Sequence, residues 1–70
     1  MKFFLFILIC SGIHGQCMPP IEMQQSFNTK YDCLVTGYDV SKEMLIDIGE
    51  QEVNKNDIYI KFICTPKVEI

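Results

Sequence analysis

The side chains with reactive chemistry in this 70-residue chain are four cysteines, Cys10, Cys17, Cys33 and Cys64, and one histidine, His14. Zinc sites built from cysteines usually contain closely spaced pairs such as Cys-x-x-Cys, and the sequence has none. A catalytic cysteine needs a base to activate its thiol, and the sole histidine lies near the N-terminus. We therefore expect no enzyme activity, no metal and no cofactor, and we expect the cysteines to form disulfides.

The N-terminal segment has the pattern of a secretory signal peptide over residues 1–15. Lys2 supplies the positive charge, and Phe3–Cys10 is an apolar run of the length that a signal peptide needs. A membrane anchor is the alternative, but a span needs about 20 apolar residues and this run has roughly half that number. We therefore expect a secreted, extracellular protein that has lost Cys10 and His14. Three cleavage points have suitable residues, after Gly12, Gly15 or Cys17, of which we prefer Gly15.

The remaining segment, residues 16–70, carries five lysines and nine acidic residues, a formal charge of −4. It has no basic stripe for a phosphate backbone or an anionic bilayer, so we expect no nucleic-acid partner and no membrane partner. A chain of about 55 residues buries too little apolar surface to outweigh its conformational entropy without a crosslink, a metal or a partner. Disulfides are therefore expected to supply part of its stability.

The cysteines left after cleavage depend on the cleavage point. Cleavage after Gly15 leaves Cys17, Cys33 and Cys64, and cleavage after Cys17 leaves only the last two. With 30 residues between Cys33 and Cys64, a bridge between them would restrict the unfolded chain by roughly 3 to 4 kcal/mol. Cys17, if retained, is an odd cysteine near the chain end, which allows an intermolecular bridge and so a dimer.

Two helices are predicted in the first part of this segment. Apolar side chains recur on one helical face over Ile21–Val35, and Gly37 follows in a position suited to a helix C-terminus. A second, short helix is predicted over residues 41–48, with Gly49 as its end. Residues 50–56 are mostly polar and predict a solvated connection.

Residues 58–64 are harder to assign. They are β-branched and aromatic, which by itself favours a strand. However, residues 16–70 contain no second run of this kind to pair with them, and an unpaired apolar edge is an aggregation hazard. We therefore predict a third helix here, ending before Pro66, against the strand tendency of Ile58–Ile63.

The segment Cys33–Met44, with the sequence Cys-Leu-Val-Thr-Gly-Tyr-Asp-Val-Ser-Lys-Glu-Met, resembles the first half of an insect odorant-binding protein. The likeness lies in a helix with a cysteine near its end, a Thr-Gly pair, a Val-Ser-x-Glu-Met helix start and an aromatic residue before another cysteine. It implies an all-α fold over residues 16–70, with about three short helices of an incomplete six-helix fold. It also implies one disulfide, between Cys33 and Cys64, with Ile60 in the place of a missing cysteine, as in the Minus-C branch.

The resemblance implies a secreted carrier of small hydrophobic molecules such as odorants or pheromones. Because the sequence ends six residues after Cys64, where the family's later helices would follow, we expect a truncated form of that fold. The alternative is a short secreted, disulfide-containing interaction peptide of the venom or immune type, without a small-molecule pocket. The resemblance also implies which apolar residues line the ligand pocket: Met23, Phe27, Tyr31, Met44, Leu45, Ile48, Tyr59, Phe62 and Ile63. For each of them, ordinary packing in the core is the alternative role.

Overall fold

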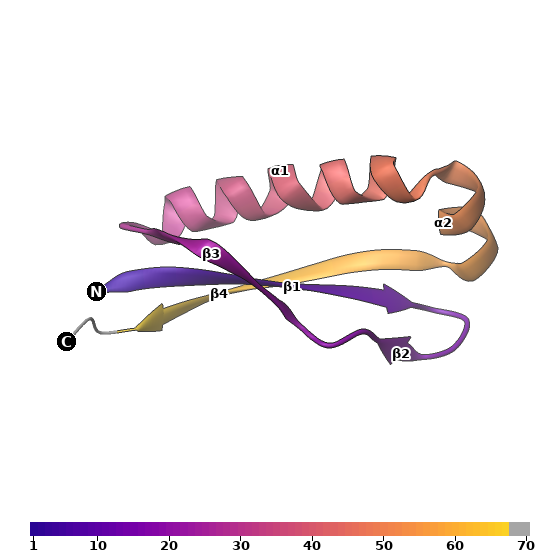
Figure 1. The fold of residues 1–70 in the computed structure, drawn as a ribbon, viewed down its shortest axis with the longest axis horizontal. Helices are drawn as coiled ribbons and strands as arrows, with labels where there is room; N and C mark the ends of the chain where they lie inside the picture. The colour runs from indigo at the N-terminus through magenta and orange to yellow at the C-terminus, as the bar shows by residue number, and fades with distance from the viewer. Residues whose placement is uncertain (68–70) are drawn as a thin grey trace.

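The computed structural model describes residues 1–67 as a mixed α/β fold, with 43% strand and 39% helix. A long helix lies along one face of an antiparallel sheet (Figure 1). The elements in chain order are β1 (Lys2–Ser11), β2 (Gln16–Cys17), β3 (Ile21–Phe27), α1 (Lys30–Ile48), α2 (Glu50–Asn56) and β4 (Ile58–Lys67).

β1 is the central strand of the sheet. Along one edge it pairs antiparallel with β4 through ten residue pairs, from Lys2 opposite Lys67 to Ser11 opposite Ile58. A strand has two edges, so the other partners of β1 lie along the opposite one. There β1 pairs antiparallel with β3 through its first half and with β2 through its last two residues. Every strand pairing within residues 1–67 therefore involves β1.

The core lies between the sheet and α1. Leu5 and Ile7 of β1 and Cys33 of α1 are fully buried in it, and Phe27 of β3 is buried beside them with 7% of its surface exposed. Residues 3–10 are aliphatic or aromatic apart from the terminal cysteine, a composition with a high strand propensity. Partly buried apolar residues surround this cluster: Phe3, Met23, Val40, Met44, Ile60, Phe62 and Cys64.

The predicted all-α fold is wrong, because an antiparallel sheet forms the centre of the structure. Residues 58–64 belong to β4, as their β-branched composition favours. Their pairing partner is the apolar run at residues 3–10, which the signal-peptide interpretation leaves out of the folded part. The prediction of a single disulfide is wrong as well, since Cys10–Cys17 and Cys33–Cys64 are both bonded.

The first two predicted helices are one helix that begins later. Ile21–Phe27 is the strand β3, so the apolar spacing there belongs to a sheet. α1 begins after Thr29, whose Oγ1 accepts a 3.1 Å hydrogen bond from the backbone N–H of Asp32. The helix then continues through Gly37 to Ile48 without a break.

The end of α1 at Gly49 agrees with the prediction. Gly49 has a φ of 95°, which favours glycine, and its backbone N–H donates a 3.1 Å hydrogen bond to the carbonyl oxygen of Leu45. Residues 50–56, predicted as a connection, form the short helix α2 instead. Asp57, in the left-handed region with a φ of 52°, ends α2 and leads directly into β4.

Gly37 has a packing role in the middle of α1. It is buried, and a Cβ atom built on it would overlap the ring of Phe62 in β4. The buried residues of α1 are Cys33, Gly37 and Ser41, which are four positions apart and so form a stripe of small side chains. This stripe allows the helix to approach the sheet closely.

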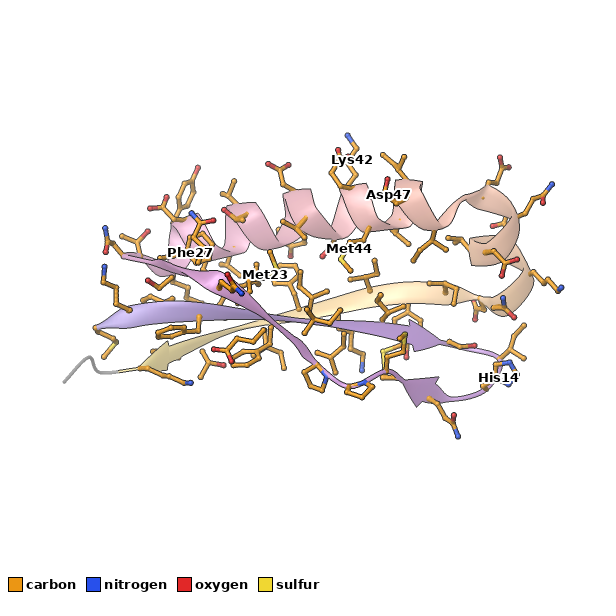
Figure 2. All side chains as sticks on the ribbon, viewed as in Figure 1. His14, Met23, Phe27, Lys42, Met44 and Asp47 are labelled. Carbon is orange, nitrogen blue, oxygen red and sulfur yellow. A yellow bond between two sulfur atoms is a disulfide. The ribbon has the colours of Figure 1, made fainter. Side chains whose placement is uncertain are left out.

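We expect Gly37→Leu to lower the free energy of unfolding by about 1 to 3 kcal/mol, because the added side chain must displace the Phe62 ring or separate α1 from β4. Lys42→Leu is the matched control, because Lys42 projects from the outer side of the same helix (Figure 2). Urea unfolding followed by circular dichroism measures both variants. An unchanged midpoint for Gly37→Leu would contradict the close approach of helix and sheet.

Candidate binding site

The position that β1 occupies in the sheet is the best-formed candidate site, and we call it the strand slot. β4 forms one side of the strand slot, β3 and β2 form the other, and α1 lies above it (Figure 1). Leu5 and Ile7 are the side chains of its occupant that are fully buried against α1, with none of their surface exposed. The strand slot therefore buries an extended peptide from both edges and from above.

Two features join α1 to β4 along the strand slot. The Cys33–Cys64 disulfide connects them covalently, with 6.1 Å between the two Cα atoms. The ring of Tyr38 in α1 packs edge-on against the ring of Phe62 in β4, with 4.8 Å between the ring centroids. On the other side only Asn28 and Thr29 separate β3 from α1 along the chain. Both sides of the strand slot are thus attached to the same helix.

The surface above the strand slot is apolar. Met23 and Phe27 of β3 and Met44 of α1 are directed into the space between helix and sheet, whereas Lys42 and Asp47 project from the outer side of α1 (Figure 2). An aliphatic side chain that enters this space from β1 leaves water almost completely, which stabilises the structure by about 1.5 to 3 kcal/mol.

The opposite face of the sheet is uncovered, since both helices within residues 1–67 lie on the other side (Figure 1). The Nζ atom of Lys67 lies 5.0 Å from the ring centroid of Phe4 and 5.7 Å from that of Phe6. Lys61 is placed similarly over the ring of Tyr59, at 5.8 Å. Such cation–π contacts contribute about 0.5 to 1 kcal/mol at exposed positions, so the occupant is held mainly from the α1 side.

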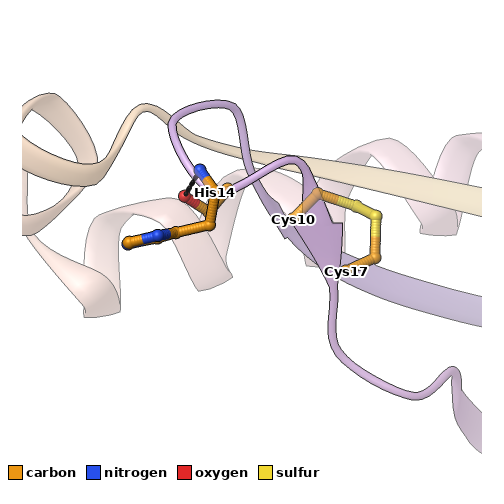
Figure 3. Close-up of a disulfide and its surroundings, with 4 residues drawn as sticks. Cys10, His14 and Cys17 are labelled. Atoms are coloured by element: carbon orange, nitrogen blue, oxygen red, sulfur yellow. Dashed lines mark hydrogen bonds between the residues drawn. A yellow bond between two sulfur atoms is a disulfide. The ribbon is translucent and has the colours of Figure 1, made fainter.

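The second disulfide joins Cys10 of β1 to Cys17 of β2. The side chain of His14, in the turn between these strands, points away from the disulfide, and its backbone N–H donates a 3.3 Å hydrogen bond to Ser11 Oγ (Figure 3). An open depression of about 360 Å³ lies beside this bridge, with Ile9, Met18 and Ile58 among its lining residues. Residues 1–67 contain no group of three or more side chains placed to hold a metal ion.

The nine predicted pocket-lining residues do not surround one cavity. Four lie in or against the core: Met23, Phe27, Met44 and Phe62. Two others are half-buried: Leu45 and Ile48. Three are exposed by 42% to 75%: Tyr31, Tyr59 and Ile63. Of the nine, Phe27 and Tyr31 line the same depression, an open one of about 370 Å³ with mostly polar neighbours.

Sequence reasoning missed the residues that fill the strand slot, above all Leu5 and Ile7. The signal that could have revealed them is present, because residues 3–10 and 58–64 are the two strongly apolar runs of the chain and have comparable lengths. Such runs are typical of neighbouring buried strands. The competing signal-peptide pattern removes one run of the pair from consideration.

No protein family, curated protein or solved structure matches this chain. The resemblance to insect odorant-binding proteins therefore stays a prediction, and the expected lack of enzyme activity stays one too. The fold and the bridges define a small, disulfide-bonded α/β protein, and two disulfides are compatible with an extracellular location. No helix within residues 1–67 is both long enough and apolar enough to cross a membrane.

We expect loss of the Cys33–Cys64 bridge, in a Cys33→Ala and Cys64→Ala double variant, to lower the free energy of unfolding by about 2 to 5 kcal/mol, because it closes the longer loop and fastens α1 to β4. The Cys10→Ala and Cys17→Ala double variant is the control. Its bridge spans only seven positions, so the loop-entropy model predicts a loss smaller by roughly 1 kcal/mol. Equal thermal midpoints for the two variants would contradict the fastening role.

Proposed function

We propose that this chain is a small extracellular binding protein for an apolar partner, and that its binding surface is the strand slot after residues 1–15 have been removed. One observation carries the proposal: the segment with the pattern of a signal peptide is also the central strand of the sheet. Removal of that segment would convert a buried apolar interior into an accessible apolar surface.

The processed chain cannot keep the core of the full-length chain. β1 supplies Leu5 and Ile7 to the core and is the only pairing partner of β3 and β4 within the described residues. A domain of this size is only marginally stable. Burying the newly exposed apolar surface against another molecule lowers the free energy of the system. An apolar partner in the strand slot supplies that cover.

An interaction protein fits this surface better than a carrier of small molecules. The strand slot presents apolar side chains from α1, and it also presents two rows of backbone N–H and C=O groups, from β3 and β4, that need hydrogen-bond partners. A small hydrophobic molecule covers the side chains and leaves the backbone groups unpaired. This difference favours the interaction peptide among the two functions expected from the sequence.

A carrier of small hydrophobic molecules is the second candidate. It is favoured by the depression that Phe27 and Tyr31 line, because its volume of about 370 Å³ falls within the range of small-ligand sites. Both residues are among those that the resemblance to odorant-binding proteins implies. The polar neighbours Gln25 and Asp32 at this depression make it less suited to a purely apolar ligand.

We expect the protein secreted from eukaryotic cells to begin at Gln16 and to enhance the fluorescence of anilinonaphthalene sulfonate, a probe of apolar surfaces. The full-length chain, made without export and refolded, should bind this probe weakly because β1 covers the core. N-terminal sequencing and probe titration measure these outcomes. A secreted product that begins at Met1, or one that binds no probe, would contradict the proposal.

We expect Met44→Glu to weaken probe binding by the secreted product about tenfold or more, because the substitution places a charge on the surface that faces the strand slot. Glu43→Gln is the control, since Glu43 is exposed on the same helix. The comparison requires the same titration with both variants. Equal weakening by the two substitutions would place the probe elsewhere on the protein.

A further inference from the structure

We propose that the strand slot of the processed protein takes an extended apolar segment of a partner protein, which pairs antiparallel to β4 in the place of β1. This inference rests on the proposed function, because it requires the removal of residues 1–15. It goes further by naming the partner: a peptide strand of about ten residues, the length over which β1 and β4 pair.

The backbone of the strand slot selects a strand. β1 pairs with β4 over its whole length and with β3 over its first half, so removal of β1 exposes unpaired groups on both sides of the gap. Each such group needs a hydrogen-bond partner when it is covered by an apolar ligand. Only a peptide in the extended conformation supplies donors and acceptors along both of its edges at the spacing of a sheet.

The side chains of the strand slot specify what the strand must carry. The positions of Leu5 and Ile7 are two residues apart and face α1, where both side chains are fully buried. The alternate positions, those of Phe4 and Phe6, face the open side beneath the ammonium group of Lys67. The partner segment therefore needs aliphatic residues at two alternate positions and favours aromatic residues between them.

The walls of the strand slot keep their attachments when β1 is removed. The Cys33–Cys64 disulfide and the edge-on contact of Tyr38 with Phe62 both join α1 to β4 without using any β1 residue. β3 stays connected to α1 through Asn28–Thr29. These attachments limit the arrangements that α1, β3 and β4 can adopt without β1, which lowers the entropy lost when a strand fills the gap.

A split form of the full chain tests this inference. Cys10→Ser and Cys17→Ser substitutions remove the bridge that holds β1, and a protease site placed in the exposed turn at residues 12–15 allows the chain to be cut after folding. The cut protein is unfolded in urea without reductant, so that Cys33–Cys64 stays intact. It is then refolded with an excess of a fluorescent peptide that has the sequence of residues 2–11 with the same serine substitution.

We expect the fluorescent peptide to elute with the larger fragment in gel filtration and to restore the circular dichroism spectrum of the uncut chain. A peptide with Leu5→Asp and Ile7→Asp should bind at least about a hundredfold more weakly, because two fully buried side chains become charged. A peptide with Lys2→Ala is the matched control and should bind within about threefold of the unchanged peptide, because Lys2 lies outside the core cluster and its hydrogen bond to Asn28 Oδ1 is exposed to solvent.

Three outcomes would overturn the inference: equal uptake of all peptides, a larger fragment that folds fully without a peptide, or a larger fragment that aggregates even in the presence of the unchanged peptide. The probe experiment separates this inference from the proposed function. Probe binding by the secreted product without uptake of the peptide would reject the strand partner and keep an apolar binding protein. Failure of both experiments would reject both.

Discussion

The pairing of β1 with β4 is the interaction on which the rest of this structure depends. Neither strand has another full-length partner within residues 1–67, and the two together form the surface on which α1 packs. α1 buries only a narrow stripe, Cys33, Gly37 and Ser41, so it has little apolar surface with which to form a core alone. The hydroxyl of Ser41 is buried there without a hydrogen-bond partner among the described residues, at a cost of about 1 to 3 kcal/mol. The sheet must offset that cost.

The sequence predicted local features of this fold better than long-range ones. The end of α1 at Gly49 and the strand tendency of β4 are determined by residues that are adjacent in the sequence, so both can be predicted from it. The helix predicted over β3 failed because Met23 and Phe27 are four positions apart. A step of four places two side chains on one face of a helix and equally on one face of a strand, so this spacing alone does not separate the two structures.

The sequence contained a signal for the candidate site, but a competing pattern in the same residues concealed it. A signal peptide requires an uninterrupted apolar run of about ten residues, whereas a strand of an antiparallel sheet with one open face needs apolar residues only at alternate positions. Residues 3–10 satisfy both requirements, and their lack of alternation favours the signal-peptide interpretation over the strand. The two roles exclude each other in a molecule that loses residues 1–15, because that loss removes the strand. Under the proposed cleavage, the full-length and processed chains would therefore have different cores, and the side chains that pack against Leu5 and Ile7 would be accessible only in the processed chain.

The Cys10–Cys17 bridge gives the order of oxidation and cleavage a physical consequence. The bridge crosses the cleavage point after Gly15, so a chain that is oxidised before it is cut keeps β1 attached to β2 by a covalent bond. β1 would then stay in the strand slot although the peptide bond after Gly15 is cut. The disulfide keeps β1 beside the slot at a high effective concentration, so the strand rebinds whenever it dissociates. A chain that is cut before it is oxidised loses β1 and leaves Cys17 without its partner. Under the proposed cleavage, the order of the two reactions would therefore decide whether the strand slot is closed or open, and only the open form would expose its apolar surface.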